Sequence, residues 1–109
     1  MDKEVKDSSQ EDLLEQAITA LQEQNWERRI EASIQLSLLN NKRAIEPLVN
    51  ALEDENLLAR QYIVASLAII GDNSVLPNLK KRQSIESDPT IKYIIKIAIE
   101  RIEQRQQEN

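Results

Sequence analysis

The stretch AIEPLVNALEDENLLARQYIVASLAIIGD, Ala44 to Asp72, contains two helical patterns separated by an acidic turn. The apolar residues of the first pattern are spaced by three and four, which places them on one face of a helix: Ile45, Leu48, Val49 and Leu52. Pro47 lies in the first turn of that helix, where its missing amide hydrogen costs little. Asn56 offers a side-chain oxygen that can cap a second helix beginning at Leu57. The stretch therefore predicts a helical hairpin.

The second helix of this hairpin, predicted over residues 57–70, is apolar on two sides. One stripe is predicted to face the first helix and form the core: Ala59, Ile63, Leu67 and Ile70. Another stripe lies on a different side: Leu58, Tyr62, Ala65 and Ile69. Apolar residues all round a helix normally mean burial, so the second stripe is either packed between neighbouring helices or exposed as an apolar groove. Gly71 is predicted to end the helix in the left-handed conformation, with Asn40 in the equivalent place of the preceding repeat.

The hairpin is repeated along the chain. A shift of 31 residues aligns Ala20 with Ala51, Asn25 with Asn56, and Arg29 with Arg60, and further matches join Leu21 to Leu52 and Leu36 to Leu67. A fixed period of this length indicates a stacked array of helical hairpins. The first helix of each hairpin is called the A helix below, and the second the B helix.

Caps and apolar spacing predict six helices, over residues 11–23, 26–39, 43–53, 57–70, 74–84 and 89–104. Ser8 or Ser9 is expected to start the first, Asn25 to cap the second, and Asp88 followed by Pro89 to open the last. We expect one domain over residues 11–105, with repeats at about 11–41, 42–72 and 73–105, between a frayed segment 1–10 and a tail 106–109.

Composition supports an all-helical, folded domain. The chain has 109 residues, of which 40% are hydrophobic and 30% charged, and only 3% are aromatic. With one glycine and three prolines, strand-forming runs bounded by turn residues are hard to find. A secretory signal is not expected, because the N-terminal stretch MDKEVKDSSQEDLL has no apolar region. A membrane span is not expected either, since Gln61–Gly71 is far shorter than the roughly 20 apolar residues needed to cross a bilayer. We therefore expect a cytoplasmic protein.

The residue types present exclude several kinds of chemistry. Without cysteine or histidine, the chain lacks thiol nucleophiles, Ser-His-Asp relays and thiolate or imidazole zinc ligands. The carboxylate clusters, such as Glu53–Glu55, fall in turns, where they cap helices or face water. We accordingly expect no catalytic residues, metal site or cofactor. The net charge of −5 argues against nucleic acid, and the run Lys80–Arg82 is expected simply to favour the end of its helix.

The pattern of Ala44 to Asp72 resembles the HEAT-like repeat of the phycobilisome lyase family, which has a proline early in helix A, an acidic turn, an arginine early in helix B, and Gly-Asp after it. The resemblance covers about residues 11–103 and implies a right-handed α-solenoid of three HEAT-like hairpins. It also implies that Arg29, Arg60 and Lys92 tie neighbouring repeats to acidic turn residues. Asn40 and Asn41 stand where the family has Gly-Asp, and the third repeat has no such ending, so altered curvature is expected.

In stacked hairpins the B helices line the concave face, so their second apolar stripes would lie together there. The residues that we predict to bind a partner on this face are Trp26, Ile30, Ile34, Leu38, Leu58, Tyr62, Ala65, Ile69, Tyr93 and Ile97. Trp26 either anchors a partner or only seals the N-terminal end of the core.

These features favour a non-enzymatic adaptor that binds a helical or extended protein segment. The resemblance supports an alternative, a subunit or small relative of bilin lyases that acts on bilin-bearing proteins. Self-association, with the groove filled by a second copy, is a third hypothesis.

The charge distribution leaves two interpretations open. Acidic groups outnumber basic ones in residues 1–31, and basic groups outnumber acidic ones in residues 74–102. This asymmetry is either that of an ordinary solvated surface or a means of steering a partner or a second copy.

Overall fold

A computed structural model describes residues 2–108, and these residues form an all-α structure. Its elements, in chain order, are α1 (Asp2–Ala20), α2 (Trp26–Leu39), the 3-10 turn η1 (Lys42–Ala44), α3 (Ile45–Asn50), α4 (Leu57–Ile70), the 3-10 turn η2 (Asn73–Val75), α5 (Leu76–Ile85) and α6 (Pro89–Glu108). They pair as the hairpins α1–α2, α3–α4 and α5–α6, as the repeat predicted.

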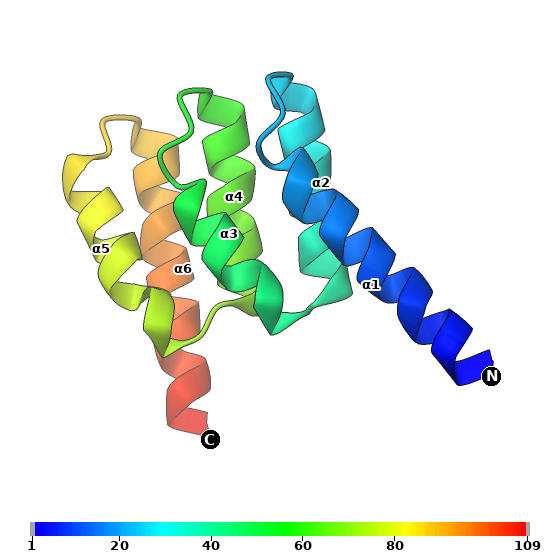
Figure 1. The fold of residues 1–109 in the computed structure, drawn as a ribbon. Coiled ribbons are helices and arrows are strands. Elements are labelled where there is room, and N and C mark those ends of the chain that lie inside the picture. The colour runs from blue at the N-terminus through cyan, green and yellow to red at the C-terminus, as the bar shows by residue number, and fades with distance from the viewer. Residues whose placement is uncertain (1, 109) are drawn as a thin grey trace.

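The hairpins stack side by side into two layers (Figure 1). The A layer contains α1, α3 and α5, and the B layer contains α2, α4 and α6, which run parallel to one another with α4 in the middle. The described part of the molecule is a slab with principal extents of 49, 38 and 16 Å. Since two packed layers of helices account for the thin dimension, each B helix has one side turned away from the A layer.

The core lies between the two layers and between adjacent B helices. The predicted core stripe of α4 is fully buried: Ala59, Ile63, Leu67 and Ile70. Its neighbours in the core come from every repeat, including Leu14, Leu36, Leu48, Leu79, Ile95 and Ile102. Val64 and Ala68 of α4 are also buried, because the middle B helix packs against both α2 and α6. The prediction of one core stripe therefore understated how much of α4 is interior.

The predicted bounds hold for α2 and α4 and for the start of α6, whereas the other helix ends differ from the prediction. Helix α1 begins at Asp2 rather than near residue 11, so residues 2–10, expected to be frayed, are helical, and the predicted start at Ser8 or Ser9 lies within the helix. No glycine or proline interrupts that segment, and Arg43 bonds the carboxylates of Glu11 and Glu15 at 2.6 and 2.7 Å. Helix α1 ends at Ala20, three residues before the predicted position, in a turn in which the amide of Leu21 bonds carbonyls of the preceding turn.

The remaining A helices begin with a 3-10 turn, which shortens their α-helical parts to α3 and α5. Asn41 and Asp72 start these turns by accepting hydrogen bonds from the amides of Arg43 and Ser74. Helix α6 continues to Glu108, past the predicted end at 104, where Arg105 donates to the carbonyls of Ala68 and Gly71 at the end of α4. The expected tail is thus helical over residues 106–108, and Asn109 lies outside the described residues.

The two predicted left-handed helix ends behave differently. Asn40 is left-handed, with φ of 49°, and its amide bonds the Leu36 carbonyl. Gly71 is not left-handed, because its φ of −71° and ψ of 159° are extended. The glycine is required by a close approach instead: a Cβ there would lie 2.5 Å from the Leu67 carbonyl oxygen, 3.0 Å from Ile102 and 3.1 Å from Val75. It therefore brings α6 and η2 close to the end of α4.

Candidate binding face

The B helices are held in a common register by side-chain caps. Asn25 accepts a hydrogen bond from the amide of Glu27, Asn56 from that of Ala59, and Asp88 from that of Ile91. Each cap satisfies an amide that has no partner within the helix. As the sequence predicted, these three residues begin α2, α4 and α6 at equivalent positions, so residues at the same distance from each cap lie at similar levels of the slab.

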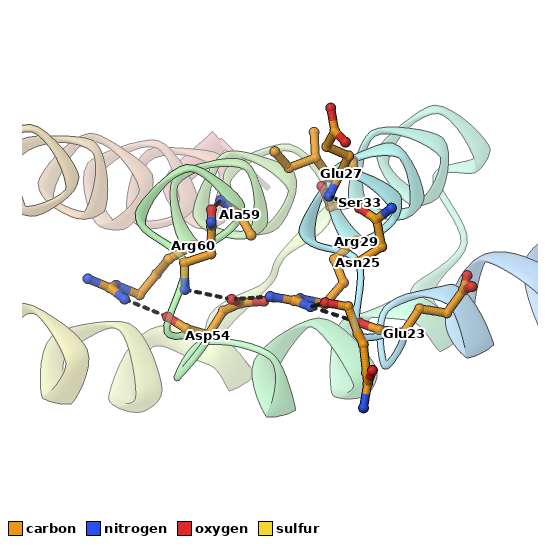
Figure 2. A network of polar contacts seen from close by, with 11 residues as sticks. Glu23, Asn25, Glu27, Arg29, Ser33, Asp54, Ala59 and Arg60 are labelled. Atoms are coloured by element: carbon orange, nitrogen blue, oxygen red, sulfur yellow. Dashed lines mark hydrogen bonds and ion pairs between the residues drawn. The ribbon is translucent and has the colours of Figure 1, made fainter.

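An arginine in the fourth position of α2 links the first two repeats. Arg29 donates from Nε and Nη2 to both carboxylate oxygens of Asp54, at 2.6 and 2.9 Å, and from Nη1 to the carbonyls of Glu23 and Gln24 in its own turn. Figure 2 shows Asp54 between Arg29 and Arg60. Burial raises the pKa of Asp54, but the hydrogen bonds from Arg29 and the Asn56 amide, together with the charges of Arg29 and Arg60, outweigh it and hold that pKa below its ordinary value.

Arg60 of α4 repeats the arrangement one repeat later, and here the pair is buried. It donates to both oxygens of Glu86 at 2.8 and 2.9 Å, and to the carbonyl of Asp54. The Glu86 side chain is 0% exposed, and the Arg60 hydrogen bonds lower its pKa despite burial. Arg82 approaches the same carboxylate at 3.3 Å and bonds Glu53 at 2.6 Å, so its charge joins the network and does more than favour a helix end.

Lys92 occupies the equivalent position in α6, at the end of the array. It is exposed, and no ion pair within 4.0 Å joins it to another of residues 9–107. The contacts of Arg29 and Arg60 cross from one repeat to the acidic turn of the next, whereas no further repeat follows Lys92 within the described residues. That these three residues serve the stacking of repeats stays a prediction, supported by the contacts of the two arginines.

The second apolar stripe of α4 is exposed at three of its four positions. Leu58 is 44% exposed, Tyr62 38% and Ile69 55%, while Ala65 is half-buried. These residues lie on the side of α4 that faces neither neighbour nor A layer, since the remainder of the helix is almost entirely buried. The sequence left this stripe as either interior or groove, and the structure exposes it.

The repeat register identifies the corresponding positions on the other two B helices. On α2 they are Glu27, Glu31, Ile34 and Leu38, and on α6 they are Thr90, Ile94, Ile97 and Arg101. We call these twelve residues of α2, α4 and α6 the B-layer face. Ile34 and Leu38 are exposed, and Ile94 and Ile97 are half-buried, so the apolar area extends across all three helices.

Some residues predicted for a partner site lie beside this face rather than in it. Trp26 and Ile30 precede Glu27 and Glu31 by one residue, which turns them about 100° around the helix axis toward α4. Trp26 and Tyr93 are exposed and Ile30 is half-buried. The prediction did not include the charged residues of the face, Glu27, Glu31 and Arg101, because it selected apolar residues rather than equivalent positions of the repeat. The shift of 31 residues indicates the two glutamates, because it aligns Leu58 with Glu27 and Tyr62 with Glu31.

Among the side chains of residues 9–107, no group of three or more that could hold a metal ion lies together. Over residues 2–108, every helix is too short or too polar to cross a bilayer. The carboxylates with shifted pKa values, Asp54, Asp72 and Glu86, are all held by hydrogen bonds to arginine or serine groups of the scaffold. A shifted pKa therefore marks stacking and capping contacts here rather than an acid–base centre.

Comparison with known proteins identifies the repeat. Residues 12–100 match the family model described as HEAT repeats. The chain belongs to the HEAT-repeat family. This agrees with the stacked hairpins and with the resemblance noted in Ala44 to Asp72, and arrays of this kind present extended surfaces to protein partners.

A curated relative is the bilin biosynthesis protein PecE of Nostoc sp. strain PCC 7120, which is 43% identical over 63 residues. The match covers 56% of this chain and 25% of PecE, so the chain spans about a quarter of the relative's length. This relative overturns the sequence-based prediction of a non-enzymatic protein, because its name assigns it to the biosynthesis of a chromophore, which is enzymatic chemistry.

Proposed function

We propose that this HEAT-repeat chain acts in bilin chemistry, as a component that binds a bilin-bearing or bilin-accepting protein while the chromophore is attached or removed. The similarity to the bilin biosynthesis protein PecE carries this proposal. Because the matched region is about a quarter of PecE, the activity of the whole relative does not transfer directly. A cytoplasmic setting is part of the proposal.

The B-layer face is the surface that we assign to this binding. It is apolar in its middle, and Tyr62 contributes an aromatic ring, a side-chain type enriched where binding energy concentrates. The ion pairs and caps described above fix the three B helices before a partner arrives, so little ordering is needed on binding. Contiguous exposed apolar area on a folded domain typically marks such a contact.

The test measures visible absorbance and complex formation together. The purified chain is mixed with a bilin, with and without a bilin-accepting apoprotein, and the spectrum and elution volume are followed. We expect the chain to change the spectrum or the rate of attachment and to co-elute with the protein partner. An unchanged spectrum and rate, with separate elution in every combination, would refute the proposal.

A matched pair of double variants locates the contact. Tyr62→Ala with Ile69→Ala removes exposed apolar groups from the B-layer face, whereas Leu13→Ala with Ile85→Ala removes comparable exposed groups from α1 and α5 of the A layer. Both doubles should retain helical circular dichroism, because all four side chains are exposed. Only the first should weaken the complex. Equal effects of the two doubles would move the contact away from the B-layer face.

A further inference from the structure

The B-layer face carries opposite charges at diagonally opposed corners. Because α2, α4 and α6 lie side by side in parallel, the twelve residues form a grid of three helices by four levels. Glu27 and Glu31 occupy the first two levels of α2, and Arg101 occupies the last level of α6. Thr90 and Leu38, at the other two corners, are uncharged.

The charges at the two corners are largely uncommitted within the chain. Among residues 9–107, neither Glu27 nor Arg101 has an ion-pair partner within 4.0 Å, and Glu31 has only the exposed Arg28, at 3.8 Å. Between the corners lie the apolar residues of the face: Ile34, Leu38, Leu58, Tyr62, Ala65, Ile69, Ile94 and Ile97.

A face with this pattern is complementary to itself. A twofold axis lying in the plane of the face, along the diagonal from Leu38 to Thr90, superposes the acidic corner of one copy on the basic corner of the other. The axis places Arg101 of each copy against Glu27 of the partner, with Glu31 one level further along α2, so the favourable contact is made twice. Tyr62 and Ala65, near the middle, meet their own counterparts. We propose that two copies of this chain associate face to face through the B-layer face.

The area available is that of a modest dimer. Three helices about 10 Å apart and about 20 Å long give a projected area of roughly 600 Å² per copy. The total of about 1,200 Å² lies at the boundary between transient and stable interfaces. The apolar middle supplies the attraction and the corner charges select the orientation, because other directions of the axis bring a charged corner onto an uncharged or like-charged one.

The dimer covers the surface assigned above to a bilin-related partner, so that partner would have to displace the second copy. The inference does not rest on the proposed function, since it follows from the charges and exposure of the face alone. Its test contains no bilin, and therefore the two proposals can fail separately.

Sedimentation velocity from about 1 µM to about 1 mM measures the self-association of the purified chain over the range expected for such an area. The wild-type chain should shift from monomer to dimer. Arg101→Glu alone and Glu27→Arg alone should each weaken the dimer about tenfold, because each reversal creates two repulsive contacts per dimer. The double variant Glu27→Arg with Arg101→Glu should recover the wild-type constant to within about threefold. Glu46→Arg on α3, an exposed reversal in the A layer, serves as the matched control and should leave the constant unchanged.

All the exchanged side chains are exposed, so each variant should retain the wild-type circular dichroism and melting temperature. A wild-type chain that remains monomeric throughout would overturn the proposal, leaving the face to a different molecule. So would a dimer that neither single reversal weakens, or a double variant as weak as the singles. Recovery in the double variant supports the twofold arrangement, since only a contact between the two corners restores it.

Discussion

Replacing Glu86 by alanine should be among the most destabilising single changes in this protein. Its carboxylate is buried, accepts two hydrogen bonds from Arg60 and a third from the amide of Asp88, and lies 3.3 Å from Arg82. The variant leaves the guanidinium groups of Arg60 and Arg82, with side chains only 9% and 12% exposed, without this neighbour. Burial prevents water from replacing the lost interaction fully.

The expected magnitude follows from that burial. Removing one partner of a buried ion pair typically costs about 3–5 kcal/mol, because the remaining charge is uncompensated. A domain of this size is stable by about 5–15 kcal/mol in total. The Glu86→Ala variant should therefore lose a large part of its free energy of unfolding and melt more than about 10 °C below the wild type.

Urea and thermal unfolding, followed by circular dichroism, measure the effect. Glu11→Ala is the control, since Glu11 also bonds an arginine, Arg43, but at an exposed site, and exposed pairs contribute little. The apolar double variant Arg60→Leu with Glu86→Leu should be much closer to the wild type than Glu86→Ala, since it removes the charge of Arg60 together with that of Glu86 and Arg82 keeps its bond to Glu53. A loss below about 1 kcal/mol in Glu86→Ala would refute the argument from buried charge.

Three further effects are expected. Gly71→Ala should lower the free energy of unfolding by about 1–3 kcal/mol, because its Cβ would meet the backbone oxygen of Leu67 at 2.5 Å, and the melting temperature measures this loss. Asn40→Gly should be neutral or stabilising and Asn40→Ala should cost about 1 kcal/mol, since the residue is left-handed; equal urea midpoints for the two variants would contradict this reason. Glu86 has a pKa lowered from its ordinary value of 4.5, so its stabilising contribution is present above that value and is lost as pH falls toward its lower folded pKa. Acid titration of stability should consequently show a shallower loss in Glu86→Gln than in the wild type.

The repeat could be predicted from the sequence because each hairpin has the same kind of side-chain cap at the start of its B helix. Asn25, Asn56 and Asp88 cap helices through contacts only two or three residues away, and such contacts depend on little beyond the local chain. The same holds for the left-handed Asn40. The bounds of α2 and α4 were predicted for this reason.

The errors occurred where distant segments meet. Gly71 was assigned a left-handed role from its place after a helix, yet its close neighbours include Ile102, which is 31 residues away. Arg105 bonds the end of α4 from α6, a contact that no local pattern shows. Arg82 was assigned to a helix end, although folding brings it to Glu53 and Glu86.

The sequence by itself determined the helical hairpins and their order, because helix caps and apolar spacing act over a single turn and repeat with the chain. Only the tertiary structure decided whether the second apolar stripe on α4 is interior or exposed, since exposure depends on where α2 and α6 lie. It buries Ile63 and Leu67 between the layers and leaves Leu58, Tyr62 and Ile69 on the surface. The same packing brings Glu27, Glu31 and Arg101, on helices far apart in the chain, onto one face.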